Sequence, residues 1–107
     1  MTPVIKLLHA DQWRAFQQSG EFAGSPDDVR DGFIHLSTPE QMPETAARYF
    51  AGAPGVIAVT LDADALGAAL RWEPSRGGAL FPHLYRALTL HDVVTAMPLA
   101  PGATLPA

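Results

Sequence analysis

The sequence predicts an α+β fold in which a small mixed or antiparallel β-sheet carries two main helices. Short strand-like runs outnumber helical ones, and both longer amphipathic stretches lie in the first half of the 107-residue chain. Ten prolines and nine glycines divide the chain into short elements. Hydrophobic residues make up 48% and charged residues 17%, which is too apolar for intrinsic disorder and is typical of one modest core.

The N-terminal segment predicts a strand followed by a helix. Residues 4–8 are apolar except for one lysine and form the first predicted strand. Asp11 suits a helix N-cap or first turn, and Trp13 and Phe16 follow at helical spacing. Gly20 is the expected end of this helix.

The next segment predicts a loop, a short strand and the second helix. Residues 24–32 are polar and turn-rich, so they are expected to form a loop before a strand at 33–37. Thr38 begins a Thr-Pro-Glu-Gln capping box with proline in the first helical position. Because Pro43 lacks an N–H for helical hydrogen bonding, the main helix is expected to start afresh near this residue.

The second half predicts strands joined by turns. The most strand-like run is 56–61, which is apolar on both faces and is expected to be central. Asp62 or Asp64 is expected to cap a helical turn at 65–69, and Gly77 begins a Gly-Gly turn. Further extended segments are expected at 70–73, 81–86 and 93–99. Residues 1–100 are expected to form a single domain, and 101–107 a loose tail.

Charge and composition argue against several classes of partner. The formal charge of −4 disfavours general affinity for nucleic acid or anionic membranes. No apolar run reaches the ~20 residues of a membrane helix, and the N-terminus is too short for a signal core. The lack of cysteine removes disulfides and thiolate chemistry and is compatible with a cytoplasmic protein.

The first candidate cluster lies on the strand at 33–37. Alternation predicts that Ile34 and Leu36 face the core, whereas Phe33, His35 and Ser37 share the other face. A histidine and a hydroxyl beside an aromatic ring suit a ribose or an aromatic ligand. The alternative is that His35 caps a loop or satisfies a buried carbonyl group.

Two further clusters combine arginines with other polar groups. Glu73 lies between Arg71 and Arg76, so its carboxylate should stay ionised and could orient a hydroxyl or stabilise developing positive charge. The alternative is a surface ion pair on a hairpin. A second group of donors suits phosphate or carbohydrate recognition, the alternative being a core aromatic pair beside a solvated arginine. The donors are His83, Tyr85 and Arg86, and Phe81 is expected on the same strand face as His83 and Tyr85.

No metal site is expected, because the four histidines have no close ligand spacing. His9 and His91 are expected to have no role in a site. The sequence also contains no Gly-x-Ser-x-Gly elbow, P-loop or Gly-x-Gly-x-x-Gly fingerprint.

Several motifs together resemble the DUF952 family of uncharacterised small bacterial proteins, from the first strand to about residue 99. They are Trp13, Gly20-Glu21-Phe22, Asp31-Gly32-Phe33-Ile34-His35-Leu36-Ser37, Leu70-Arg71-Trp72-Glu73 and Phe81-Pro82-His83-Leu84-Tyr85. The resemblance implies a split sheet like that of the ADP-ribosyltransferase fold, which cradles NAD in a cleft. No metal is implied.

The resemblance also implies roles for the candidate residues. His35 would contact the ribose or adenylate part of NAD, Ser37 and Tyr85 would line the pocket, and Glu73 would stabilise an oxocarbenium-like state. An arginine (Arg71, Arg76 or Arg86) would hold the pyrophosphate. The ligand expected is a small molecule with phosphate or ribose. The chain lacks a Glu-x-Glu or Gln-x-Glu pair, so a non-catalytic binding module or a structural domain stays open beside an enzyme.

Overall fold

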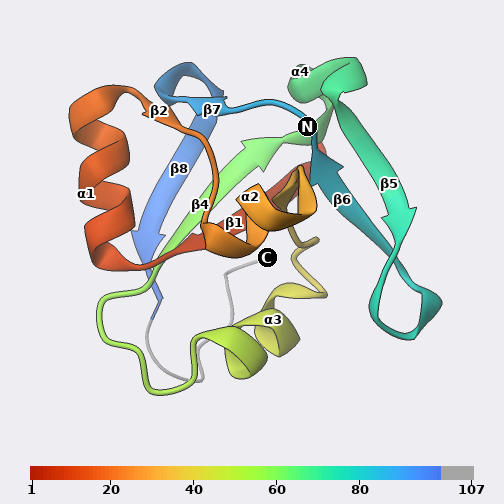
Figure 1. Cartoon of the computed structure of the whole chain (residues 1–107), viewed down its shortest axis with the longest axis horizontal. Helices are drawn as coiled ribbons and strands as arrows, with labels where there is room; N and C mark the ends of the chain where they lie inside the picture. The colour runs from red at the N-terminus through yellow and green to blue at the C-terminus, as the bar shows by residue number, and fades with distance from the viewer. Residues whose placement is uncertain (100–107) are drawn as a thin grey trace.

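Three small antiparallel sheets with helices packed around them make up residues 1–99, the part of the chain that the computed structural model describes (Figure 1). The strands are β1 (Pro3–Leu8), β2 (Glu21–Phe22), β3 (Ile34–His35), β4 (Ile57–Asp62), β5 (Leu70–Pro74), β6 (Leu80–Leu84), β7 (Leu88–Thr89) and β8 (Val93–Pro98). The helices are α1 (Ala10–Ser19), α2 (Pro26–Asp31), α3 (Met42–Tyr49) and α4 (Ala63–Leu66). The α+β class is confirmed, and the predicted tail at 101–107 lies outside the described residues.

Both hydrophobic core clusters include residues of the sheet of order β1-β4-β8. Alternation along β1 sends Val4 and Leu8 into a core cluster with Phe16 of α1. Ile5 packs on the opposite face, in a cluster with Met42 of α3. The central position predicted for β4 is confirmed, since β4 pairs with both β1 and β8.

A second sheet of order β3-β6-β5 meets this one at a short segment of backbone. A continuous strand at 33–37 is predicted, but only Ile34–His35 pairs with β6. Two residues later, the N–H and the carbonyl oxygen of Ser37 bond Ile5 of β1 at 2.9 and 2.7 Å. The segment therefore passes from one sheet to the other, and the β5–β6 hairpin lies on the side of the molecule opposite α1 (Figure 1).

The prediction of a loop at 24–32 is wrong over Pro26–Asp31, which forms α2. Ser25 is its N-cap, with proline at the first position, and the Asp28 carboxylate accepts the Ser25 N–H at 2.9 Å. The helix ends at Gly32, whose φ of 87° is left-handed and therefore favours glycine. The segment is thus a capped helix of two turns whose polar composition resembles that of a loop.

The remaining predictions are largely confirmed. Gly20 ends α1 with a φ of 83°, Pro43 lies in the first turn of α3, and the Asp62 side chain accepts the Asp64 N–H at the start of α4. The pairing of β2 with β7 is not foreseen by the sequence analysis. Among residues 1–99, no helix is long and apolar enough to cross a membrane.

Candidate functional site

A cavity of about 440 Å³ lies among β1, α2, β3, α3 and β6, which is within the size range of small-molecule sites. Four of the residues predicted for a site line it: His35, Ser37, Arg76 and His83. Five further charged residues lie in its wall: Lys6, Asp27, Asp28, Arg30 and Asp31. The cavity therefore brings together groups from segments far apart in the sequence.

One wall of the cavity is built on a buried ion pair. The Lys6 ammonium group lies 2.9 Å from Asp28 Oδ2 and donates to the His35 carbonyl at 3.0 Å. Asp28 is 2% exposed, and its Oδ1 lies 2.6 Å from His35 Nδ1. Burial opposes the charge of Asp28, but hydrogen bonds from His35 and the charge of Lys6 outweigh it and lower the pKa of this carboxyl. Burial also lowers the pKa of Lys6, against the attraction of Asp28.

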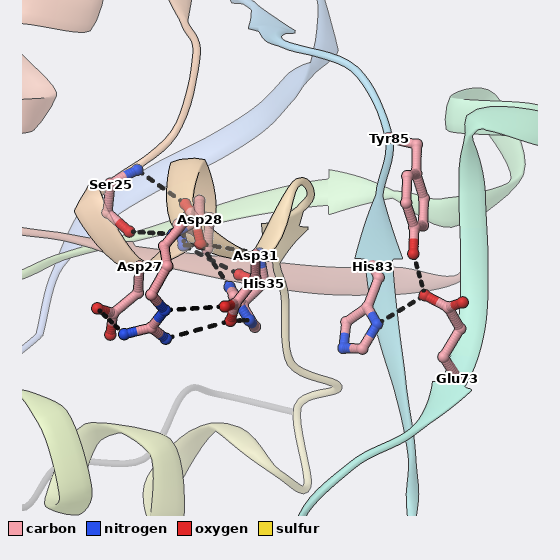
Figure 2. A network of polar contacts seen from close by, with 10 residues as sticks. Ser25, Asp27, Asp28, Asp31, His35, Glu73, His83 and Tyr85 are labelled. Carbon is pink, nitrogen blue, oxygen red and sulfur yellow. Dashed lines mark hydrogen bonds and ion pairs between the residues drawn. The ribbon is translucent and has the colours of Figure 1, made fainter.

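His35 uses both of its ring nitrogens within this wall (Figure 2). Nδ1 faces Asp28, and Nε2 lies 3.0 Å from Asp31 Oδ2. The hydrogen bond from Arg30 lowers the pKa of Asp31, so both carboxylates are ionised acceptors at neutral pH. Both contacts are hydrogen bonds when both ring nitrogens carry hydrogen. His35 then has no ring nitrogen left for a ligand unless one of these carboxylates moves.

On β6, His83 lies between the cavity and Glu73 (Figure 2). Its Nδ1 is 2.9 Å from Glu73 Oε1, and the Tyr85 hydroxyl donates to the same oxygen at 2.7 Å. Phe33 stacks on the imidazole with ring centres 4.0 Å apart. Hydrogen bonds from Tyr85 and His83 lower the pKa of Glu73, whereas the bond to Glu73 raises the pKa of Tyr85. Glu73 itself is not among the lining residues and reaches the cavity through His83.

The three arginines of the second half do not converge. The Arg71 guanidinium lies 4.6 Å from the centre of the Tyr85 ring. Arg86 donates to both carboxylate oxygens of Asp92, at 2.9 and 3.0 Å. Neither Arg71 nor Arg86 is among the lining residues of the cavity. Of the three arginines, Arg76 alone lines it, and its contact with a phosphate group stays a prediction.

Arg76 lines the cavity, and its guanidinium has one donor without a partner among the described residues. Its Nη2 donates to Thr45 Oγ1 at 2.8 Å, and its guanidinium lies 4.7 Å from the centre of the Phe81 ring. Its Nη1 is buried and has no hydrogen-bond partner among the described residues. Within the described part of the chain, the two other cationic side chains of the wall, Lys6 and Arg30, bond aspartates, whereas Arg76 contacts no carboxylate. Such a group is costly to bury, so the arrangement favours an anionic ligand.

Comparisons with known proteins identify the family. Residues 7–96 match the family described as protein of unknown function (DUF952). The chain belongs to the DUF952 family. The resemblance drawn from its motifs is thereby confirmed.

Solved structures of protein CC0527 from Caulobacter crescentus are similar to this DUF952 chain. The crystal structure is 45% identical, covers 92% of this chain and 87% of that one, and gives a TM-score of 0.90. The solution NMR structure is 46% identical, covers 92% and 85%, and gives a TM-score of 0.83. A comparison with curated proteins found no match.

Sequence reasoning missed the acidic wall of the DUF952 cavity. The sequence pattern predicts a loop for Asp28 and Asp31 and therefore does not predict their contacts with His35. Two signals were present: the Ser25 capping box, and Lys6 in an otherwise apolar strand, because a buried lysine needs an anionic partner.

Among residues 1–99, no group of three or more His, Cys, Asp or Glu side chains could hold a metal ion.

Proposed function

We propose that the cavity binds NAD or an ADP-ribose-like ligand, with the Arg76 guanidinium holding a phosphate group. The observation that carries the proposal is the buried Nη1 of Arg76, an N–H donor without a partner among the described residues. A phosphate oxygen would satisfy this donor and balance the charge of the guanidinium. The proposal includes the likeness to the ADP-ribosyltransferase fold that the motifs imply, and a cytoplasmic setting.

The test is calorimetric and thermal-shift titration with ADP-ribose, NAD and nicotinamide. ADP-ribose at millimolar concentration should raise the melting temperature, because a ligand that prefers the folded state stabilises it. Arg76→Gln should weaken binding by roughly tenfold or more, the expected loss for a charge-assisted bond. Arg48→Gln is the matched control, because Arg48 is exposed and pairs with Glu44 on the surface of α3. Lack of any stabilisation at millimolar ADP-ribose or NAD would contradict the proposal.

A second candidate function is cleavage of the nicotinamide–ribose bond of NAD. It is favoured by the contact of Glu73, an ionised carboxylate, with the cavity-lining ring of His83. Water would add to the ribose carbon, nicotinamide would leave with the bonding electrons, and the proton of water would pass to His83 or solvent. Release of nicotinamide by the wild type but not by Glu73→Gln would support catalysis. Binding without release would leave the protein a ligand-binding module.

A further inference from the structure

Two histidines of the cavity wall differ in what they offer to a ligand. His35 has a carboxylate at each ring nitrogen, so its donors are already used. His83 has a carboxylate at Nδ1, and no described residue bonds its Nε2. Figure 2 shows this second nitrogen of His83 on the side of the ring away from Glu73.

The surroundings of His83 fix both the orientation and the hydrogen position of its ring. The stacked Phe33 ring restrains the imidazole plane, and the residue is 4% exposed. Ionised Glu73 only accepts hydrogen bonds, so Nδ1 must carry the hydrogen of their contact. In the neutral imidazole, Nε2 then holds a lone pair and acts as an acceptor.

We propose that Nε2 of His83 accepts a hydrogen bond from a hydroxyl group of the ligand, so that the cavity selects hydroxyl-bearing phosphate esters such as sugar phosphates. The inference rests on the proposed function, because Arg76 supplies the phosphate contact. The Arg76 guanidinium packs on Phe81, and Phe81 and His83 occupy alternate positions on one face of β6. Such positions are separated by about 7 Å along a strand, which a phosphate and a ring hydroxyl of one sugar phosphate can span.

Binding measurements with matched ligands test the selection. Ribose 5-phosphate is compared with 2-deoxyribose and 3-deoxyribose 5-phosphates and with inorganic phosphate. Wild type should bind ribose 5-phosphate at least roughly fivefold more tightly than one of the deoxy esters, the ratio expected for one hydrogen bond. His83→Phe should abolish this preference and retain affinity for inorganic phosphate. His83→Gln, whose amide oxygen can accept, should restore part of it.

His9→Phe is the control, because His9 also lines the cavity but its ring packs in a tilted arrangement against Phe50 and contacts no carboxylate among the described residues. The preference for the hydroxylated ester should survive in this variant. Equal affinity of wild type for all three esters, with binding still dependent on Arg76, would overturn the role of His83 and leave the proposed function standing. Failure of every ester and of ADP-ribose to bind would overturn both.

A measurement on the wild type does not depend on the folding of any variant. Long-range ¹H–¹⁵N correlation spectra at neutral pH report which ring nitrogen of His83 carries hydrogen. The expected result is hydrogen on Nδ1 only, and the Nε2 resonance should shift when ribose 5-phosphate is added. Hydrogen on Nε2, alone or together with Nδ1, would overturn the proposal.

Discussion

Asp28 joins three parts of the chain through one carboxylate. It accepts from the Lys6 ammonium group on β1, from the backbone and ring of His35 on β3, and from the Ser25 N–H at the start of α2. Because Asp28 is almost completely buried, each of these donors depends on it for a counter-charge or an acceptor. The same carboxylate thus stabilises the fold and shapes one wall of the cavity.

Replacement of this carboxylate should be strongly destabilising. Asp28→Asn leaves the Lys6 ammonium group buried without an anion, so the free energy of unfolding should fall by about 3–5 kcal/mol. Urea denaturation at pH 7 measures the loss. Asp27→Asn is the control, because Asp27 is on the same helix but exposed and, among residues 1–99, forms an ion pair only with Arg30, at 3.3 Å. That variant should change stability by less than about 1 kcal/mol. Similar losses in the two variants would contradict the argument.

The alternation of residues in short strands is the part of the site that the sequence predicts well. Ile34 and Leu36 face the core as predicted, each 2% exposed. The opposite face does gather Phe33 and His35, yet the partners of His35 come from α2, some four to seven residues earlier. Local patterning gives the direction of a side chain, whereas the group it meets depends on how neighbouring elements pack against the strand.

At the scale of elements, the two capping boxes show why α2 is easily overlooked. Thr38-Pro39-Glu40-Gln41 precedes an apolar stripe and so predicts a helix, whereas Ser25-Pro26-Asp27-Asp28 precedes charged residues. Helix α2 has six residues and buries little besides Asp28, so it shows no apolar periodicity. Its capping signal is nevertheless of the same kind, with serine as N-cap and proline next.

The glycine before α2 is required by the position of Asp28. A Cβ atom on Gly24 would lie 2.8 Å from the Cβ atom of Asp28, and the φ of Gly24 is 124°. Gly24→Ala should therefore destabilise the protein by about 1–3 kcal/mol through crowding, in addition to backbone strain.

The glycine at the other end of α2 provides the control. Gly32 also has a positive φ, but a Cβ atom there meets nothing within 4 Å. Gly32→Ala should cost only the strain of about 1 kcal/mol. Chemical denaturation of both variants measures the difference. A larger loss for Gly32→Ala than for Gly24→Ala would show that crowding of Asp28 is unimportant.

At the scale of the whole molecule, the net charge of −4 conceals local compensation. The acids of α2 neutralise Lys6 and Arg30, and Asp92 neutralises Arg86. The positions of Arg71, Arg76 and Arg86 in the sequence do not predict this compensation, because the β5–β6 hairpin and the turn after it place the three side chains beside different neighbours. Among the lysines and arginines of the cavity wall in residues 1–99, Arg76 alone has a charge that no carboxylate compensates.

This compensation predicts how stability changes in acid. The pKa of Asp28, Asp31 and Glu73 is lowered in the folded protein, and the bond from Arg86 lowers the pKa of Asp92 to about 2. A carboxyl group whose pKa is depressed by folding contributes its stabilisation above its unfolded value, near 4, and loses it as the pH falls through the folded value. The contribution of these carboxyl groups to the free energy of unfolding should therefore be constant from pH 7 to about 5 and fall steeply between pH 4 and pH 2.

The ion pair Arg86–Asp92 allows the predicted loss of stability in acid to be tested quantitatively. A double-mutant cycle with Arg86→Gln and Asp92→Asn, followed by urea denaturation, should give a coupling energy of about 1 kcal/mol at pH 7, after allowance for the partial exposure of Arg86. Near pH 2 most of this coupling should be lost, since half of the Asp92 carboxyls are then protonated in the folded protein, and it should vanish at still lower pH. The seven lysines and arginines remain cationic in acid while the carboxylates are neutralised, so mutual repulsion of the cations adds to the loss of stability. An undiminished coupling at pH 2 would mean that the bidentate bond to Asp92 does not stabilise its ionised form.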